Sequence, residues 1–214
     1  MSDRVMPTEL RLRLRGFFLS NKLAQSRARH MRVLDAMSPG LKREVTMEIN
    51  RIWIQNVSFL QAVLHEAEIG GHRSKIHAFI VGVTMGLETS CHAQDDYFGA
   101  VQTLCILNRG LVSRNKRLHS AGAVWGVDFV LSNIGLLEPF ECWAMTYVEV
   151  MSLQRDRFFQ LVEQHDSTCP GLKRKVRWFA AWLATQRALL LEARKRIHTN
   201  SIATYQQRLN RSIA

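Results

Sequence analysis

The spacing of apolar residues changes twice along this 214-residue chain, and this change constrains the fold more than any other feature. Apolar residues recur at helical spacing over the first sixty or so residues and again after Arg155. Between Phe79 and Arg155 the apolar runs are short, contain Val, Ile, Thr, Tyr and Phe, and are separated by Gly, Asn, Asp or Ser. The sequence therefore predicts an α+β fold: an N-terminal helical linker, an antiparallel, jelly-roll-like β-roll of roughly eight strands, and C-terminal helices.

The helical regions have recognisable starts and faces. Ser38-Pro39 is a typical helix start, with a capping hydroxyl before a proline at the first helical position. The segment from Leu10 to Met37 also indicates helix, interrupted or bent near Gly16. A final helix is expected from about Leu172 to Ile197. The apolar residues expected on one face of the helices after Pro39 are Leu41, Val45, Ile49, Ile52 and Trp53, and those on the final helix are Val176, Phe179, Leu183 and Leu190.

The central runs predict strands joined by tight turns. Typical runs are FIVGVTMGLE, VQTLCILNRGLVSR and AMTYVEVMSL, and the dipeptides Arg109-Gly110 and Asn115-Lys116 indicate hairpin turns. The chain is accordingly divided into a helical linker at 1–65, a β-roll at 66–170, and a basic closing helix and tail at 171–214.

Charge follows the same division. Residues 1–51 carry 11 basic and 5 acidic side chains, residues 52–170 carry 8 and 12, and residues 171–214 carry 10 and 1. Two basic ends suit an anionic membrane surface, an acidic protein or nucleic acid, while an ordinary solvated helix face is the alternative for any single cluster. The longest run without a charge, Ile52–His65, has fourteen residues, which is too short to span a bilayer.

Motifs for catalysis or metal binding are missing from the sequence. The four cysteines are too widely spaced for a zinc site, and the histidines do not form a metal-ligand pattern. The five tryptophans fall on apolar periodicities and are expected in the core. The chain is therefore not expected to be an enzyme, to bind a metal or to need a cofactor.

One stretch, HSAGAVWGVDFVLSN from His119 to Asn133, has the pattern of a phosphate-binding loop. It combines glycines and small residues with an aromatic residue and a hydrophobic run. A phosphate needs positive charge or free backbone N–H groups nearby, and the one charged side chain in the stretch is Asp128. The stretch thus has the residue pattern of an anion-binding loop but lacks the positive charge that such a loop needs.

Four segments, taken in order, carry a resemblance to a known family. They are RVLDAMSPGLKREVTMEINRIWIQNVSFL, ILNRGLVSR, AGAVWGVDFVLSN and TYVEVMSLQRDRFFQLVEQHDSTCPGLKRKVRWFA. They resemble the end of a helical C-linker, a strand-Gly-strand signature around Gly110, a phosphate-binding cassette, and a last strand with closing helices. The family is the C-linker and cyclic-nucleotide-binding domain of ether-à-go-go, hyperpolarisation-activated and cyclic-nucleotide-gated channels. The resemblance covers about residues 8–195.

The resemblance also identifies degenerate ligand positions. In members that bind cyclic nucleotide, a Phe-Gly-Glu holds the ribose and a later Arg pairs with the cyclic phosphate. Here Trp125, Gly126 and Val127 replace the first motif, and Glu138 falls near the Arg position. Asp128 and Phe129 complete the cassette, where backbone N–H groups from Gly126 to Phe129 remain as an unselective anion nest. Since no Lys or Arg occurs between Arg117 and Arg155, we do not expect cyclic AMP or cyclic GMP to bind.

By resemblance, the chain is a cytoplasmic regulatory and assembly module of a voltage-gated potassium or cation channel, at the cytoplasmic face of a membrane. Its expected partners are other subunits of the same channel or complex. The final helix, through Val176, Phe179 and Leu183, or the tail around Ile202 and Tyr205, is expected to close the empty roll near Trp125 and Val127. The alternative is a structural subunit of a larger complex, since the Arg-rich N-terminus leaves a mitochondrial location open. Nucleic acid is not an expected partner, because no room remains for a helix-turn-helix.

Overall fold

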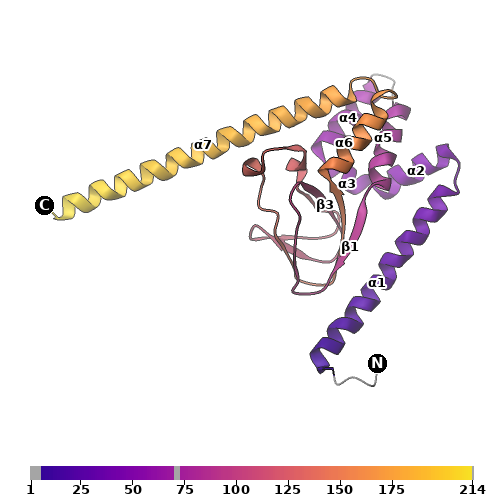
Figure 1. Ribbon diagram of the computed structural model, residues 1–214, viewed down its shortest axis with the longest axis horizontal. Helices are drawn as coiled ribbons and strands as arrows, with labels where there is room; N and C mark the ends of the chain where they lie inside the picture. Colours follow the sequence, from indigo (N-terminus) through magenta and orange to yellow (C-terminus); the bar gives the residue numbers. More distant parts are fainter. Residues whose placement is uncertain (1–5, 70–72, 214) are drawn as a thin grey trace.

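The computed structural model describes the backbone of residues 6–69 and 73–213, and the side chains of 6–19, 32–66 and 75–197. Five helices come first in the chain, and they pack beside the strands (Figure 1). Their bounds are α1 (Thr8–Asp35), α2 (Pro39–Ile49), α3 (Arg51–Asn56), α4 (Ser58–Ile69) and α5 (Arg73–Met85).

Eight strands in the described residues form two antiparallel four-stranded sheets. One sheet has the order β1-β8-β3-β6 and the other the order β2-β7-β4-β5. The strands are β1 (Glu88–His92), β2 (Tyr97–Phe98), β3 (Thr103–Arg109), β4 (Val112–Arg114), β5 (Arg117–His119), β6 (Val124–Trp125), β7 (Cys142–Ala144) and β8 (Val148–Gln154). The α+β class predicted from the sequence is therefore correct.

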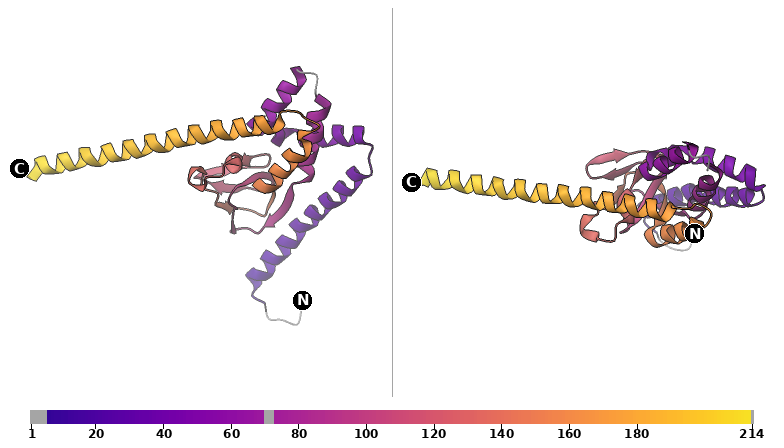
Figure 2. Two further views of the ribbon diagram at one scale, coloured as in Figure 1. Left: turned by 45° about the horizontal axis from the view of Figure 1, so that its top comes forward. Right: turned by 90° about the horizontal axis from the view of Figure 1, so that it is seen from above.

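Two helices follow the strands, and the second is much longer than predicted. They are α6 (Arg155–Asp166) and α7 (Leu172–Ile213). The first turns of α7 pack on the body, and the rest of the helix projects away from it (Figures 1 and 2). The predicted end near Ile197 is therefore wrong by about four turns, because no glycine or proline interrupts the segment that follows.

The buried side chains form two clusters. The larger joins α3, α4, α5, α6 and α7 to one side of the β1-β8-β3-β6 sheet and includes Phe79, Leu104 and Phe158. The smaller lies between the two sheets and includes Trp125 and Cys142. The β1-β8-β3-β6 sheet is thus packed on one face by helices and on the other by the second sheet. This arrangement positions the loop between β6 and β7 beside α7.

The prediction of a strand beginning near Phe79 is wrong. Residues 73–85 form α5, in which Phe79, Ile80 and Val83 are fully buried at helical spacing. Val, Ile and Thr favour strands only weakly, and the tertiary packing of α5 against α4 and α6 overrides that preference. The strands therefore begin at Glu88, and residues 66–85, assigned to the β-roll from the sequence, are helical wherever the structure describes them.

Local signals at turns and helix ends are more reliable. Helix α2 begins at Pro39 as predicted, and the Ser38 hydroxyl accepts a hydrogen bond from the Leu41 N–H. Asn115 and Lys116 form the predicted hairpin turn between β4 and β5, both with positive φ. Gly110 also lies at a turn with positive φ, but that turn connects strands of different sheets.

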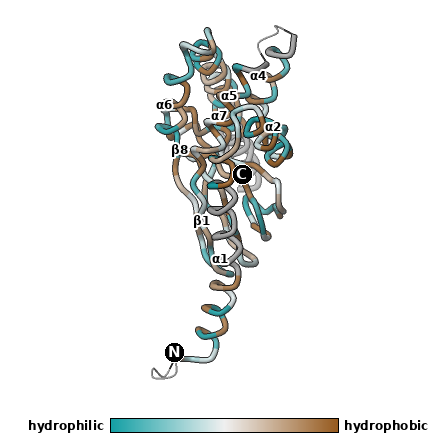
Figure 3. Tube along the Cα trace, turned by 90° about the vertical axis from the view of Figure 1, so that its right-hand side faces the viewer, coloured by the Kyte–Doolittle hydropathy of each residue, from teal (hydrophilic) through white to brown (hydrophobic). Residues whose placement is uncertain are grey.

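Gly16 does not interrupt α1, contrary to the prediction. A Cβ at this position would collide with the ring of Tyr147, whose hydroxyl donates a 2.8 Å hydrogen bond to the Arg13 carbonyl. The glycine therefore allows α1 to approach the start of β8. Toward the free end of α1, exposed Leu10 and Leu12 alternate with arginines, a pattern of mixed hydropathy visible in Figure 3.

The apolar face predicted for α2 and α3 is only partly buried. Trp53 lies in the main core, as predicted, whereas Leu41, Ile49 and Ile52 are exposed. The buried positions of α2 instead include Thr46. A repeating apolar pattern indicates a helix but does not fix which side faces the core when both sides carry apolar residues.

Candidate functional site

The loop between β6 and β7 forms the cassette that the sequence singled out. After Trp125, Gly126 adopts φ of +73° and starts the short 3₁₀ helix Val127–Val130, and a second one follows at Ile134–Leu136. A Cβ on Gly126 would collide with the carbonyl oxygen of Thr103. Only glycine combines this backbone conformation with such a close approach to β3.

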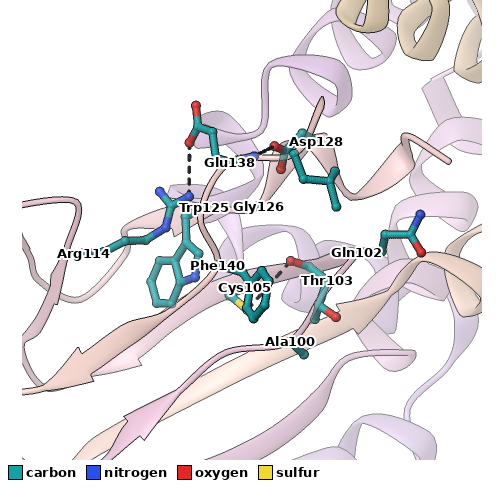
Figure 4. Close-up of a pocket in the computed structure, with 11 residues that line it drawn as sticks. Ala100, Gln102, Thr103, Cys105, Arg114, Trp125, Gly126, Asp128, Glu138 and Phe140 are labelled. Carbon is teal, nitrogen blue, oxygen red and sulfur yellow. Dashed lines mark hydrogen bonds and ion pairs between the residues drawn. The ribbon is translucent and has the colours of Figure 1, made fainter. Parts of the chain in front are cut away.

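Glu138, which the resemblance predicts near the position of a phosphate-pairing Arg, is held by two arginines. Its Oε1 lies 2.6 Å from Nη2 of Arg187 on α7, and its Oε2 lies 3.1 Å from Nη2 of Arg114 on β4. Its backbone N–H donates a 2.7 Å hydrogen bond to Asp128 Oδ2. Figure 4 shows Glu138 between Arg114 and Asp128, with dashed lines to both.

The charges of this network are balanced. Arg187 also lies 3.9 Å from Asp128 Oδ2, so two guanidinium groups face two carboxylates. Arg114 is buried and donates a further hydrogen bond to the Pro139 carbonyl. An incoming phosphate would have to displace a carboxylate already bound by charge-assisted hydrogen bonds, which are about twice as strong as neutral ones.

The cavity beneath the network is too small for a nucleotide. It has a volume of about 10 Å³, which is room for about one water molecule. A pocket for a drug-sized ligand has roughly 300–1,000 Å³. The residues that line it are Ala100, Gln102, Thr103, Cys105, Arg114, Trp125, Gly126, Asp128, Leu137, Glu138 and Phe140.

The cavity also lacks an activated nucleophile. Burial raises the pKa of the Cys105 thiol to about 12. A thiol with so high a pKa is protonated at neutral pH and reacts poorly. Within the residues that the structure describes, no group of three or more His, Cys, Asp or Glu side chains is placed to hold a metal ion.

Because of this network, the stability of the fold should vary with pH in the acidic range. Partial burial acts to raise the pKa of Glu138, but hydrogen bonds from Arg187 and Arg114 outweigh it and leave the pKa below its usual value. A carboxyl with a lowered pKa in the folded state stabilises the fold above the pKa of the unfolded chain, and this contribution disappears as the pH falls through the folded pKa. We expect wild type to be more stable than Glu138→Gln at neutral pH, with the difference shrinking below about pH 4.

Urea unfolding of both proteins between neutral pH and about pH 3 measures this difference. The substituted glutamine keeps the size of the side chain but has no titrating carboxyl. A difference that stays constant over the whole range would show that the Glu138 carboxylate does not contribute through its charge.

The other predicted cassette residues are split between the two cores. Phe129 lies in the main core with its ring centroid 5.1 Å from that of Phe158, and Val127 packs against the same cluster. Trp125 belongs to the cluster between the sheets, where its ring lies beside His119. Asp128 is almost fully buried.

The predicted lid residues lie at the start of α7. Val176 and Leu183 are buried in the main core, and the half-buried Phe179 ring lies 5.2 Å from the Phe59 ring. The helix lies against both 3₁₀ helices of the cassette, with Val127 but not Trp125 in the shared cluster. Leu190, predicted on the same apolar stripe, is exposed. The side chains of Ile202 and Tyr205 lie outside the described residues.

Arg114 and Arg187 are residues of the candidate site that the sequence did not indicate. The sequence has no Lys or Arg between Arg117 and Arg155. However, β4, which precedes that interval, and α7, which follows it, each bring one arginine to Glu138. Arg187 follows Leu183 by one helical turn, so a helix with Leu183 buried at the cassette would also direct Arg187 toward it. The four-residue spacing between Leu183 and Arg187 was the sequence signal from which the position of Arg187 could have been predicted.

No family model matches the chain, and no curated protein is similar to it. None of the helices in the described part of the chain is long and apolar enough to cross a membrane.

Proposed function

We propose that the chain is a cytoplasmic regulatory and assembly module of a voltage-gated potassium or cation channel. In this proposal its cyclic-nucleotide-binding fold holds its own Glu138 where a cyclic phosphate would bind. The observation that carries the proposal is the Glu138 carboxylate between Arg114 and Arg187 above a cavity of about 10 Å³. A module closed by its own side chains regulates through contacts with its neighbours rather than through a diffusible ligand.

The strand pairing supports the roll. Strand β1 pairs with β8, β2 with β7, β3 with β6, and β4 with β5, so each pair is nested inside the previous one. A long hairpin that folds over on itself gives this nesting, and it is the topology of a double-sheet jelly roll. The position of the cassette between β6 and β7, followed by two closing helices, agrees with the resemblance drawn from the sequence.

Closure by α7 does not need a ligand in this proposal. In binding members, cyclic nucleotide draws the final helix over the roll. Here Leu183 is buried, and Arg187 bridges to the cassette through Glu138 and Asp128. The helix is therefore held in the closed position by groups of the chain itself.

The proposed assembly role is supported by exposed apolar side chains on the N-terminal helices. Leu41, Ile49 and Ile52 lie on α2 and α3 and are each about half exposed or more. Contiguous exposed apolar surface marks interaction sites. In the family that the chain resembles, this helical linker packs against neighbouring subunits.

Cyclic nucleotide is expected to leave the protein unchanged. With cyclic AMP or cyclic GMP at about 1 mM, the melting temperature should not rise, because a ligand stabilises only the state that it binds. Calorimetry should give no saturable heat. A saturable melting shift, with a Kd below about 10 μM, would contradict a roll filled by Glu138.

A second candidate function is a structural subunit of a larger complex, favoured by the basic residues of α1, including Arg11, Arg13 and Arg15. Sequencing the transcript that encodes this chain would distinguish the two functions. Six hydrophobic spans upstream in the same reading frame would indicate a channel, and a cleavable presequence would indicate a mitochondrial subunit.

A further inference from the structure

An apolar groove runs between α4 and the start of α7, on the side away from the cassette. It has a volume of about 650 Å³, and Phe59, Ala62 and Val63 of α4 form one wall. Trp178 and Trp182 of α7 line the other wall and are 76% and 53% exposed. The prediction that all five tryptophans lie in the core is wrong for these two and for Trp143, which is half-buried and belongs to neither core cluster. Two neighbouring exposed tryptophans are rare on a free surface, and Trp is enriched at the energetic centres of interfaces.

The two tryptophans belong to a stripe that continues along α7. Trp178, Trp182, Thr185 and Leu189 follow one another at intervals of four, three and four residues, and all four are exposed. This is the spacing of a coiled-coil seam. The stripe lies on the opposite side of the helix from Val176 and Leu183, which are buried in the core. Helix α7 therefore has one apolar face toward its own body and a second that faces outward.

We propose that this outward face binds α7 of a second copy of the chain, with the two helices antiparallel. Antiparallel pairing about the midpoint of the stripe sets Trp178 of each copy opposite Leu189 of the other. It also sets Trp182 opposite Thr185, so that each large side chain meets a smaller one. The contact is the same from both sides, as a two-fold symmetric dimer requires.

Charge at the ends of the stripe supports the same orientation. Arg174 lies one turn before Trp178 and is exposed. Glu192 lies about one turn after Leu189, is also exposed, and has Arg196 of its own helix 3.1 Å from its Oε1. Glu192 is also the single acidic residue of the 171–214 segment. Antiparallel pairing brings Arg174 of one copy beside Glu192 of the other, twice per dimer. Parallel pairing would instead bring Arg174 beside Arg174 and each tryptophan against its own copy.

The dimer also gives α7 a partner where it leaves the body. An isolated helix is marginal in water, and most helical stability in proteins comes from packing an apolar face. The projecting part of α7 exposes Leu189, Leu190 and Leu191. Packing of Leu189 on the second copy covers the part of this surface nearest the groove. The interface lies away from Glu138, so it does not depend on whether the roll binds ligand.

The test is the mass of the purified full chain by sedimentation equilibrium and by light scattering. We expect a dimer at about 10 μM that Leu189→Glu weakens about tenfold or more. Leu118→Glu is the matched control, because Leu118 on β5 and Leu189 are both 67% exposed. The unfolding midpoint measured at a concentration where both variants are monomeric should be the same, which excludes misfolding. A monomeric wild type, or equal weakening by both changes, overturns the proposal.

Charge reversal tests the orientation. Arg174→Glu and Glu192→Arg should each weaken the dimer by about two- to fivefold, and the double variant should recover wild-type affinity. In a parallel pair residue 174 meets its own copy, so Arg174→Glu would exchange one like-charge pair for another and leave the affinity nearly unchanged, which overturns the antiparallel arrangement. If wild type binds anionic lipid vesicles through Trp178 while staying monomeric, the surface is a membrane contact and the proposal fails.

Discussion

Changing Leu183 to Asp is expected to lower the free energy of unfolding by about 4 kcal/mol. Leu183 is 8% exposed within the main core, so the change removes buried apolar surface and leaves a carboxyl without a partner there. The chain should melt about 10 °C lower. Phe179→Asp should have a smaller effect of the same sign, because Phe179 is only half-buried against Phe59. Thermal and urea unfolding of the purified variants measure both effects.

Leu190→Asp is the matched control on the same helix. Leu190 is 47% exposed, and the same chemical change there should cost less than about 1 kcal/mol. If Leu183→Asp and Leu190→Asp had the same small effect, α7 would not be held against the cassette. The closed position proposed for the helix would then be wrong, whatever the roll binds.

Gly126→Ala is expected to destabilise the fold by several kcal/mol, on the order of 3 or more. Gly126 has positive φ, and an added Cβ would collide with the Thr103 carbonyl. This carbonyl belongs to the backbone of β3 and cannot turn aside as a flexible side chain would. Either β3 or the cassette must shift, which would also move Glu138 away from Arg187. Circular dichroism and the unfolding midpoint report the loss.

Substitutions at two other glycines separate the cost of the positive φ from the cost of the collision with β3. Gly171 also has positive φ, but nothing lies within 4 Å of an added Cβ, so Gly171→Ala should show the conformational cost alone, about 1 kcal/mol. Gly40 lies near the start of α2 with open space around it, and Gly40→Ala should be neutral or slightly stabilising. If Gly126→Ala cost no more than Gly171→Ala, the close approach of the cassette to β3 would not matter.

Local chemistry made part of this structure predictable. The Ser38-Pro39 start of α2 and the Asn115-Lys116 turn depend on backbone preferences of a few residues, and both are confirmed. The predicted stripe on α7 is correct for Val176 and Leu183, which are buried, but wrong for Leu190, which is exposed where the helix leaves the body. Helix α5 was mistaken for a strand because its residues suit both structures, and only packing against α4 and α6 decides between them.

The candidate site shows a different limit. The resemblance predicts Glu138 near a ligand position and predicts repulsion of a phosphate, but it does not predict what neutralises this carboxylate. Arg114 and Arg187 lie on either side of Glu138 in the sequence, and Arg187 is on an element that only the fold brings back to the cassette. The exposure of Trp178 and Trp182 could not be predicted from the sequence either, because an apolar stripe has the same pattern whether it faces a core or a partner.

The nested strand pairing restricts the order in which the roll can form. The innermost pair closes a turn of two residues, with Arg114 opposite Arg117, so it forms from the chain's own local contacts. The outermost pair sets Glu88 opposite Ser152, and closing such a long loop costs more chain entropy before any contact compensates it. Proteins dominated by distant contacts fold in about milliseconds to seconds. We therefore expect the roll to form from the β4–β5 hairpin outward, with β8 pairing last and α6 and α7 docking after it.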